Sequence, residues 1–216
     1  MRIAVWSFSG AGLGLLACLR ARRDVVIQRH RGVTFGEAHF AHTVFALLLA
    51  SVLCAVALGL FANTYTDDVV VLACAFLLYS GTRLSVIDID THALPHRVLL
   101  WSVVCLAPLL FVAAVTSDDV ALDGVLLGSL VMWCVMKVLE VLSRGDLGRA
   151  DVTFAAYLGL FVGGLSLESV ATALVASFTC GGVVALVLML VRRAGRTAHI
   201  PFGPFLFFGA VVAVLR

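Results

Sequence analysis

The sequence predicts an all-α, polytopic membrane protein with about eight transmembrane helices, organised as one integral membrane domain over residues 1–216. Of the 216 residues, 62% are hydrophobic and only 13% are charged, whereas a soluble domain carries about 25% charged residues. The mean hydropathy is +1.11. Such a chain needs no soluble core, because lipid takes up its apolar surface. Helices are the only open structure that satisfies every backbone group in lipid.

Apolar runs define the expected helices in chain order. They fall at about 3–19, 39–62, 69–87, 98–115, 121–142, 152–167, 169–191 and 202–215. The sixth and eighth runs are short for a hydrocarbon layer about 30 Å thick. We therefore expect these two helices to tilt little or to be sheltered by their neighbours.

The arginines predict the orientation in the membrane. The first connection, from about Arg20 to Ala38, is rich in arginine, and the third, fifth and seventh connections also contain arginine. The even connections, with the stretches "NTYTDD", "TSDDVALD" and "SLES", contain neither Lys nor Arg. Because positive residues mark the cytoplasmic side, we expect the odd connections in the cytoplasm and both termini outside. The basic first connection should lie against anionic lipid headgroups.

Two acidic clusters then fall on the same, cytoplasmic side. Asp88 and Asp90 follow the third helix, and Asp146 and Asp151 precede the sixth. Acidic residues that border a membrane helix are expensive and usually face a partner or a wet cavity. Asp88 and Asp151 have no Lys or Arg four residues away, which is typical of a proton relay, a cation site or aspartic hydrolysis. In hydrolysis, two close carboxyls would share one proton and serve as acid and base.

Other polar residues suggest simpler roles. Lys137 and Glu140 are three apart on the fifth helix and predict a structural ion pair. His92 and His96 are four apart, but Pro95 between them interrupts a helix, so we expect surface histidines and no metal site. The six cysteines are scattered singly in apolar runs without a CxxC pair, which favours small core residues over zinc or disulfides: Cys18, Cys54, Cys74, Cys105, Cys134 and Cys180.

Three stretches carry a more specific signal: "IDIDTHALP" from Ile87, "GRADVTFAAYLGLFVG" from Gly148 and "IPFGPFLFFGAVVAVL" from Ile200. The first resembles the I-D-x-D-T-x-x-L-P stretch of the type IV prepilin peptidase family, a group of membrane-embedded aspartic proteases of the GxGD type. The second is similar to that family's G-x-G-D and the A-x-L-G helix after it, and the third to its closing I-P-F-G-P-F helix. The resemblance covers the third to eighth helices.

This resemblance implies a multi-pass protein of the bacterial inner (plasma) membrane that cleaves the leader peptide of prepilin or pseudopilin precursors at the cytoplasmic face, for type IV pili or protein secretion. It implies that Asp88 and Asp151 are catalytic and act on one water, without a metal or organic cofactor. Asp90 would tune the pKa of its neighbour or bind the backbone of the loop, and a simple loop cap ahead of Thr91 is an equally open interpretation. Pro95 would end the loop after the first aspartate, and Gly148 would let the second loop approach the first. The expected partners are the precursor and membrane lipid, with no nucleic acid.

The chain departs from the family pattern in several places. Ala150 replaces the second glycine of G-x-G-D, so the backbone there is less free to adopt a positive φ. Placing Asp146 in the catalytic slot would misplace the following helix by five residues, so Asp151 is preferred. His96 follows the "LP" pair, where the family often has an acidic or amide residue. The first connection has no cysteine, unlike the CxxC insert of long members, so N-methylation is not expected.

Two alternative functions stay open at this point. The first is a small proton-coupled transporter that uses the same acids, which would have broken helices near the middle of the bilayer. The second is a catalytically silent relative that acts in pilus or secretion assembly, an idea that the Ala150 replacement supports.

Overall fold

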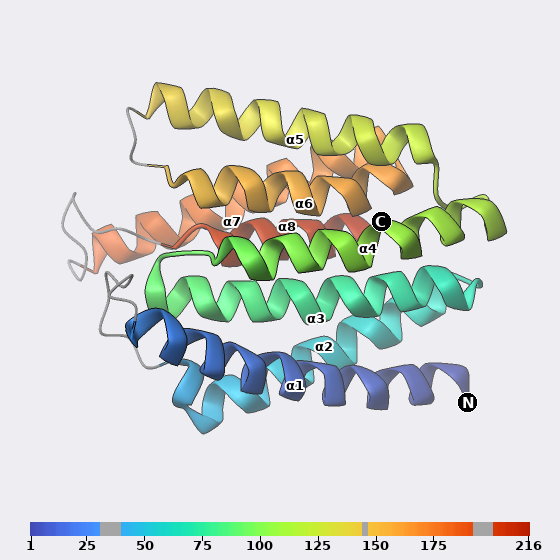
Figure 1. Ribbon diagram of the computed structural model, residues 1–216, viewed down its shortest axis with the longest axis horizontal. Helices are drawn as coiled ribbons and strands as arrows, with labels where there is room; N and C mark the ends of the chain where they lie inside the picture. The colour runs from blue at the N-terminus through green and yellow to red at the C-terminus, as the bar shows by residue number, and fades with distance from the viewer. Residues whose placement is uncertain (31–39, 144–146, 192–200) are drawn as a thin grey trace.

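The computed structural model describes residues 1–30, 40–143, 147–191 and 201–216, and every element in these ranges is helical (Figure 1). The helices run up and down, and both termini lie at the same end of the bundle (Figure 1). In chain order they are α1 Arg2–His30, η1 Phe40–His42, α2 Val44–Thr64, α3 Asp68–Thr91, α4 His96–Thr116, α5 Leu122–Leu142, α6 Arg149–Leu165, α7 Leu167–Leu190 and α8 Gly203–Val214.

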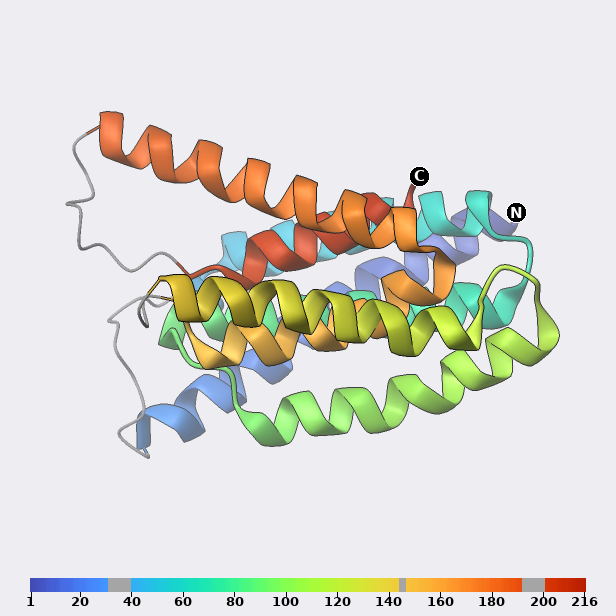
Figure 2. The same ribbon diagram turned by 90° about the horizontal axis from the view of Figure 1, so that it is seen from above.

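The predicted fold class is confirmed. Within the described ranges, six helices are long and apolar enough to cross a membrane, namely α1 to α5 and α7. The remaining two, α6 and α8, have 17 and 12 residues, as the short sixth and eighth runs predict. Both are sheltered, because α6 packs against α4, α5, α7 and α8, and α8 packs against α3, α6 and α7. Figure 2 shows α8 lying between α7 and the rest of the bundle.

The centre of the bundle is α3. In its most apolar stretch 78% of the residues are buried, more than in any other of the six candidate spans. It contacts α1, α2, α4 and α8, so its last turn is held from several sides. An element in this position can present a polar side chain to the interior of the protein rather than to lipid.

Close packing fixes α6 against α5. A Cβ atom added at Gly128 or Gly163 would collide with the backbone of the facing helix, so only glycine permits this approach. Small residues allow membrane helices to come together in this way, because van der Waals contact is a main attraction between them. The start of α6, which carries Asp151, is therefore held by a rigid helix pair.

The first helix is longer than predicted. The sequence pattern suggests that it ends near residue 19, but α1 continues to His30. Arginine is a good helix former, and in the added turns Ala21, Val25 and Gln28 continue the buried stripe that includes Ala17 and Cys18. Asp24 in this extension pairs with Arg83 of α3, with 2.7 Å between Oδ2 and Nε. The third connection was expected to contain Arg83 as well as Arg97, but Arg83 lies within α3 and its charge is paired inside the bundle.

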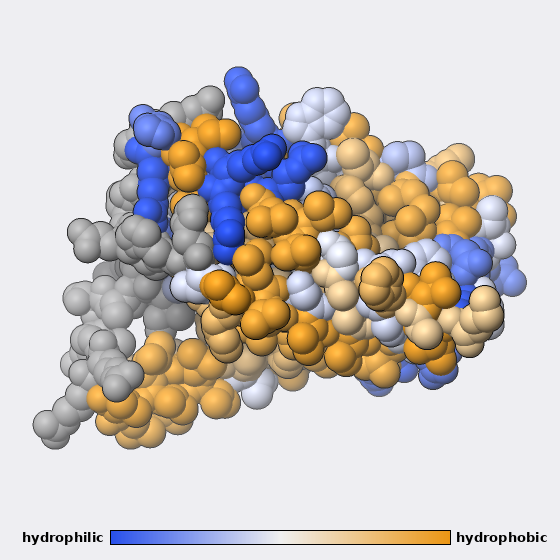
Figure 3. All heavy atoms as spheres, turned by 90° about the horizontal axis from the view of Figure 1, so that it is seen from below, coloured by the Kyte–Doolittle hydropathy of each residue, from blue (hydrophilic) through white to orange (hydrophobic). Residues whose placement is uncertain are grey.

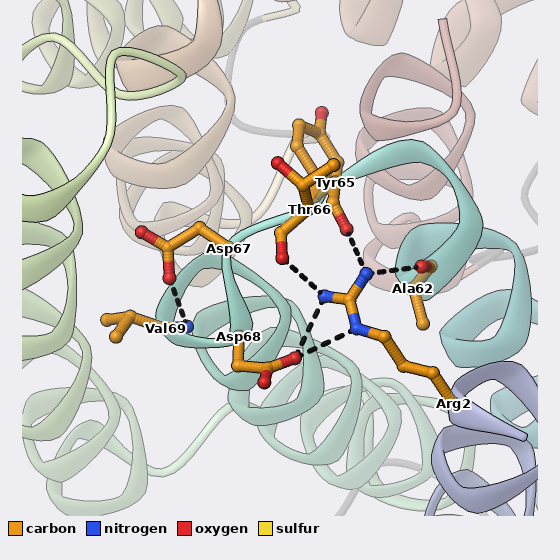
Figure 4. A network of polar contacts seen from close by, with 7 residues as sticks. All are labelled: Arg2, Ala62, Tyr65, Thr66, Asp67, Asp68 and Val69. Atoms are coloured by element: carbon orange, nitrogen blue, oxygen red, sulfur yellow. Dashed lines mark hydrogen bonds and ion pairs between the residues drawn. The ribbon is translucent and has the colours of Figure 1, made fainter.

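At the opposite end of the bundle, Arg2 is the centre of a network of hydrogen bonds and an ion pair (Figure 4). The Arg2 guanidinium donates to the carbonyls of Ala62, Tyr65 and Thr66 at 2.9–3.0 Å and to Asp68 Oδ1 at 3.0 Å. These carbonyls belong to the end of α2 and the turn after it, where helical acceptors lack partners. Arg2 therefore ties the start of α1 to the turn between α2 and α3.

The surface polarity agrees with a membrane-spanning bundle. Figure 3 shows hydrophilic residues gathered toward the end of the molecule at which α1 ends, and a mainly hydrophobic surface toward the middle. The prediction that all cysteines are core residues is only partly right: Cys18, Cys54 and Cys74 are buried, whereas Cys105 and Cys134 are exposed and Cys180 is intermediate. The two exposed thiols lie on α4 and α5, helices that turn one whole face outward.

Candidate active site

Asp88 and Asp151 come from distant parts of the chain to one end of the bundle. Asp88 lies in the last turn of α3 and Asp151 in the first turn of α6, and these two helix ends lie at the same side of Figure 1. Both residues are buried, with 5% and 9% of their surface exposed. Their carboxyl groups are near enough for the charge of one to act on the other.

The third quoted segment also reaches this place. The backbone N–H of Gly203, the first residue of α8, donates to Asp88 Oδ2 at 3.0 Å. A Cβ atom at position 203 would lie 2.7 Å from the same oxygen, so any side chain here would displace the Asp88 carboxyl. Sequence reasoning missed Gly203 as a site residue, although the glycine in "IPFGPF" was a signal that could have found it.

Asp90 has a different environment from Asp88. It is fully buried and accepts two backbone hydrogen bonds from η1, from Phe40 N at 2.7 Å and Ala41 N at 2.9 Å. Of the three roles considered for Asp90, which are pKa tuning, backbone binding and a cap ahead of Thr91, this geometry corresponds to backbone binding. Asp90 thereby anchors the chain entering α2 to the end of α3.

The turn after α3 reverses sharply at His92. This residue is left-handed with φ 50°, and its N–H donates to the Asp88 carbonyl at 2.8 Å. Pro95 directly precedes α4, and its carbonyl accepts from Val98 N and Leu99 N. Pro95 is therefore the last residue of the loop that joins α3, which carries Asp88, to α4. The interrupted helix keeps His92 and His96 off one regular face.

Of the two histidines expected at the surface, His96 is exposed, whereas His92 is half-buried and its Nδ1 atom is buried without a hydrogen-bond partner within the described ranges. The sharp left-handed turn explains this burial, because it keeps the residue at the packed end of α3. The His92 imidazole is close enough to act electrostatically on Asp88. In the parts of the chain that the structure describes, no group of three or more His, Cys, Asp or Glu residues could hold a metal ion.

The start of α6 is regular. Gly148 is the N-cap with φ −67°, a conformation open to any residue, but a Cβ there would lie 3.3 Å from Asp151 Oδ2. Gly148 thus gives room beside the carboxyl. Ala150 is helical, and His92 is the one non-glycine residue with positive φ in the described ranges, so replacing glycine at position 150 creates no strain. Asp146, the alternative aspartate, lies outside the described residues.

An ion-pair bridge supports this helix start. Lys137 Nζ lies 2.7 Å from Glu140 Oε2, which confirms the predicted pair on α5. Glu140 Oε1 also lies 3.6 Å from Arg149 Nε at the first residue of α6. Glu140 therefore links the end of α5 to the turn that carries Asp151.

The chemistry open to this arrangement follows from the two buried carboxyls. Close carboxyls in a medium of low polarity cannot both ionise easily, so one proton is shared between them. The charged member can accept a proton from water while the protonated member donates to an oxygen of a bound substrate. The site is thus suited to hydrolysis without a cofactor.

Known proteins resemble the chain over these helices. The sequence model of the type IV leader peptidase family matches residues 70–186. The prepilin leader peptidase/N-methyltransferase of Aeromonas hydrophila is 30% identical over 150 residues, which are 67% of this chain and 49% of that protein. The protein of the same name from Burkholderia pseudomallei is 31% identical over 172 residues, 77% of this chain and 52% of its own length.

A third relative is the type 4 prepilin-like proteins leader peptide-processing enzyme of Escherichia coli O78:H11. It is 34% identical over 134 residues, 60% of this chain and 46% of that enzyme. The chain thus spans about half the length of the curated relatives it matches. No solved structure gives a significant match.

Proposed function

The chain belongs to the type IV leader peptidase family, and on this premise we propose that it is an aspartic endopeptidase of the bacterial inner membrane. It removes the leader peptide of prepilin or pseudopilin precursors at the cytoplasmic face. The observation that carries this proposal is the meeting of three separate segments at one end of the bundle: Asp88 on α3, Asp151 on α6 and the Gly203 N–H that binds Asp88.

In the proposed reaction, one carboxylate of the pair takes a proton from a water molecule, and the water oxygen attacks the carbonyl carbon of the scissile peptide bond. The protonated carboxyl of the pair donates to the carbonyl oxygen. The carbon–nitrogen bond then breaks, the leaving nitrogen takes up a proton, and the leader departs with a new carboxylate. Asp88 and Asp151 are the catalytic residues in this scheme.

The supporting residues hold this pair in place. Gly203 donates a backbone hydrogen bond that orients Asp88. Gly148 leaves space beside Asp151. Asp90 anchors η1, and Pro95 ends the turn that begins at the last residues of α3. Well-oriented groups matter because small displacements of a catalytic group strongly reduce the rate.

A cytoplasmic site is supported by the arginines. The end of the bundle that carries Asp88 and Asp151 is also the end at which α1 finishes with Arg29 and His30. Exposed Arg20 and Arg23 lie on the extension of α1 toward the same end. Positive residues near membrane helices mark the cytoplasmic side, which is where a leader preceding an apolar helix is found before cleavage.

The two alternative functions have less support. A transporter would place its acids near the bilayer midplane on broken helices, but Asp88 and Asp151 occupy a last and a first helical turn. The idea of a silent relative depended on Ala150, and this residue adopts ordinary helical backbone.

Purified protein in detergent should be mixed with a precursor that has a basic leader, a glycine and then an apolar helix. Wild type should release the leader, whereas Asp88→Asn and Asp151→Asn should release none. Asp118→Asn, at an exposed aspartate in the turn at the other end, is the matched control and should cleave normally. Proton flux in vesicles without cleavage would support the transporter, and folded wild type without either activity would support the silent relative.

A further inference from the structure

A long hollow lies between α2, α3 and α8. Its volume is about 470 Å³, and its lining is almost wholly apolar. At one end it is bordered by Ile89 and Pro204, and at the other by Leu60 and Leu215. The hollow therefore runs along the helices from the end that carries the candidate site toward the opposite end.

The first of these ends is lined by chain neighbours of the candidate site, whereas Asp88 and Asp151 themselves do not line the hollow. Ile89 follows Asp88 in α3, and Pro204 follows Gly203, whose N–H binds Asp88. Ser85 also lines the hollow and lies three residues before Asp88, on the same side of α3. A ligand that lies along the hollow thus has its near end next to the helical turns that carry Asp88 and Gly203.

Ser85 carries an unused polar group in this wall. Its residue is 7% exposed, and its Oγ is buried without a hydrogen-bond partner among the described residues. Serine within a helix usually donates to a carbonyl one turn earlier, and buried polar atoms are rarely left unpaired. An unpaired hydroxyl next to the candidate site indicates a polar group supplied by a ligand.

We propose that this hollow, lined by α2, α3 and α8, receives the apolar helix of the membrane-anchored precursor. The proposal rests on the proposed function, in which the cleaved bond lies just ahead of such a helix. The Ser85 hydroxyl donates to a backbone carbonyl in the first turn of the bound helix. Apolar side chains of that helix fill the hollow farther from the site.

The dimensions and the access agree with this occupant. The wall formed by α8 has 12 residues, which span about 18 Å at 1.5 Å per residue, so about three turns of a bound helix can lie beside it. The walls formed by α2 and α8 expose large apolar side chains toward the outside: Leu53 on α2 is 58% exposed and Phe208 on α8 is 49% exposed. A precursor already in the membrane can reach the hollow sideways.

A second hollow offers a matched control. It lies between α1, α3 and α4 and has a volume of about 650 Å³. Leu16 and Leu72 are among its apolar lining residues. Its last contribution from α3 is Tyr79, more than two helical turns before Asp88. This hollow is larger but does not reach the candidate site.

The test compares Leu53→Trp, which fills the first hollow, with Leu16→Trp, which fills the second. Each variant is given the full precursor and a soluble peptide that has the same leader and cleavage site but ends a few residues later. Leu53→Trp should lower kcat/KM for the precursor at least tenfold and leave the peptide unchanged. Leu16→Trp should change neither.

Ser85→Ala removes the proposed hydrogen bond, which corresponds to a loss of about fivefold in kcat/KM for the precursor. A photo-crosslinking amino acid at position 53 should capture the precursor, and one at position 16 should not. Capture of phospholipid alone at position 53, with normal cleavage by Leu53→Trp, would overturn the proposal. If wild type cleaves neither substrate, the proposed function itself fails, which is a different result.

Discussion

The contact between Gly203 and Asp88 gives a sharp test of the candidate site. Replacing Gly203 with alanine would place a Cβ atom 2.7 Å from Asp88 Oδ2 and 3.1 Å from its Cγ. Ordinary contacts of a carbon atom lie at about 3.5 Å or more, so the carboxyl must move by several tenths of an ångström. The 3.0 Å hydrogen bond from Gly203 N is then lengthened or lost.

The expected magnitude follows from that bond. A hydrogen bond to a charged group contributes about 1.5–3 kcal/mol, and each 1.4 kcal/mol corresponds to about tenfold in rate. Gly203→Ala should therefore lower kcat about ten- to hundredfold. The fold should change little, because the group that must move is the end of a side chain and because alanine favours a helix by up to about 1 kcal/mol over glycine.

The assay is cleavage of the precursor, together with thermal unfolding in detergent. Gly182→Ala in α7 is the control, since a Cβ at that position meets nothing within 4 Å, and it should leave kcat unchanged. A Gly203→Ala variant that cleaves at the wild-type rate would refute the idea that Gly203 orients Asp88. A variant that unfolds early would instead show that α8 itself depends on this glycine.

Three further predictions concern stability, measured by thermal unfolding in detergent. Asp90→Ala leaves two backbone N–H groups of η1 without acceptors and should lower the free energy of unfolding by about 2–4 kcal/mol, whereas Asp90→Asn, which keeps one acceptor oxygen, should lower it less. In a double-mutant cycle, Asp24 and Arg83 should couple by about 1–2 kcal/mol, more than the exposed ion pair that Arg2 makes at the other end; equal coupling would contradict the importance of burial. His92→Gly should raise stability by about 0.5–1 kcal/mol because glycine accepts φ 50° without strain, while His92→Val should lower it.

Much of the architecture could be predicted because the membrane restricts the choice. Apolar runs can only be helices in lipid, so their number and order follow from hydropathy, and the short runs correspond to α6 and α8. Counting the runs also predicts that α3 ends and α6 begins on the same side of the membrane, which places Asp88 and Asp151 at the same end of the bundle. The finer contacts needed information that hydropathy does not contain.

The end of α1 illustrates what could not be predicted. The composition of an arginine-rich segment after a membrane span predicts a connecting loop. Such a segment nevertheless folds as a helix when its apolar residues have helical spacing and pack against a neighbouring helix. Here the stripe around Ala21 and Val25 is buried, and Asp24 finds Arg83 on α3. The partner is distant in sequence, so only the tertiary structure reveals it. The donor from Gly203 to Asp88 was hidden for the same reason.

The two aspartates of "DID" at the end of α3, Asp88 and Asp90, lie on different faces of the helix and have different partners. Residues two apart on an α-helix point about 200° apart, so Asp88 and Asp90 cannot face the same neighbour. Asp90 meets two backbone donors of η1, and Asp88 meets the donor from α8 and the charge of Asp151. The central helix thus uses one carboxyl to fix its own end, and under the proposed function it offers the other for chemistry. Loss of Asp90 should therefore appear first in stability, and loss of Asp88 first in cleavage.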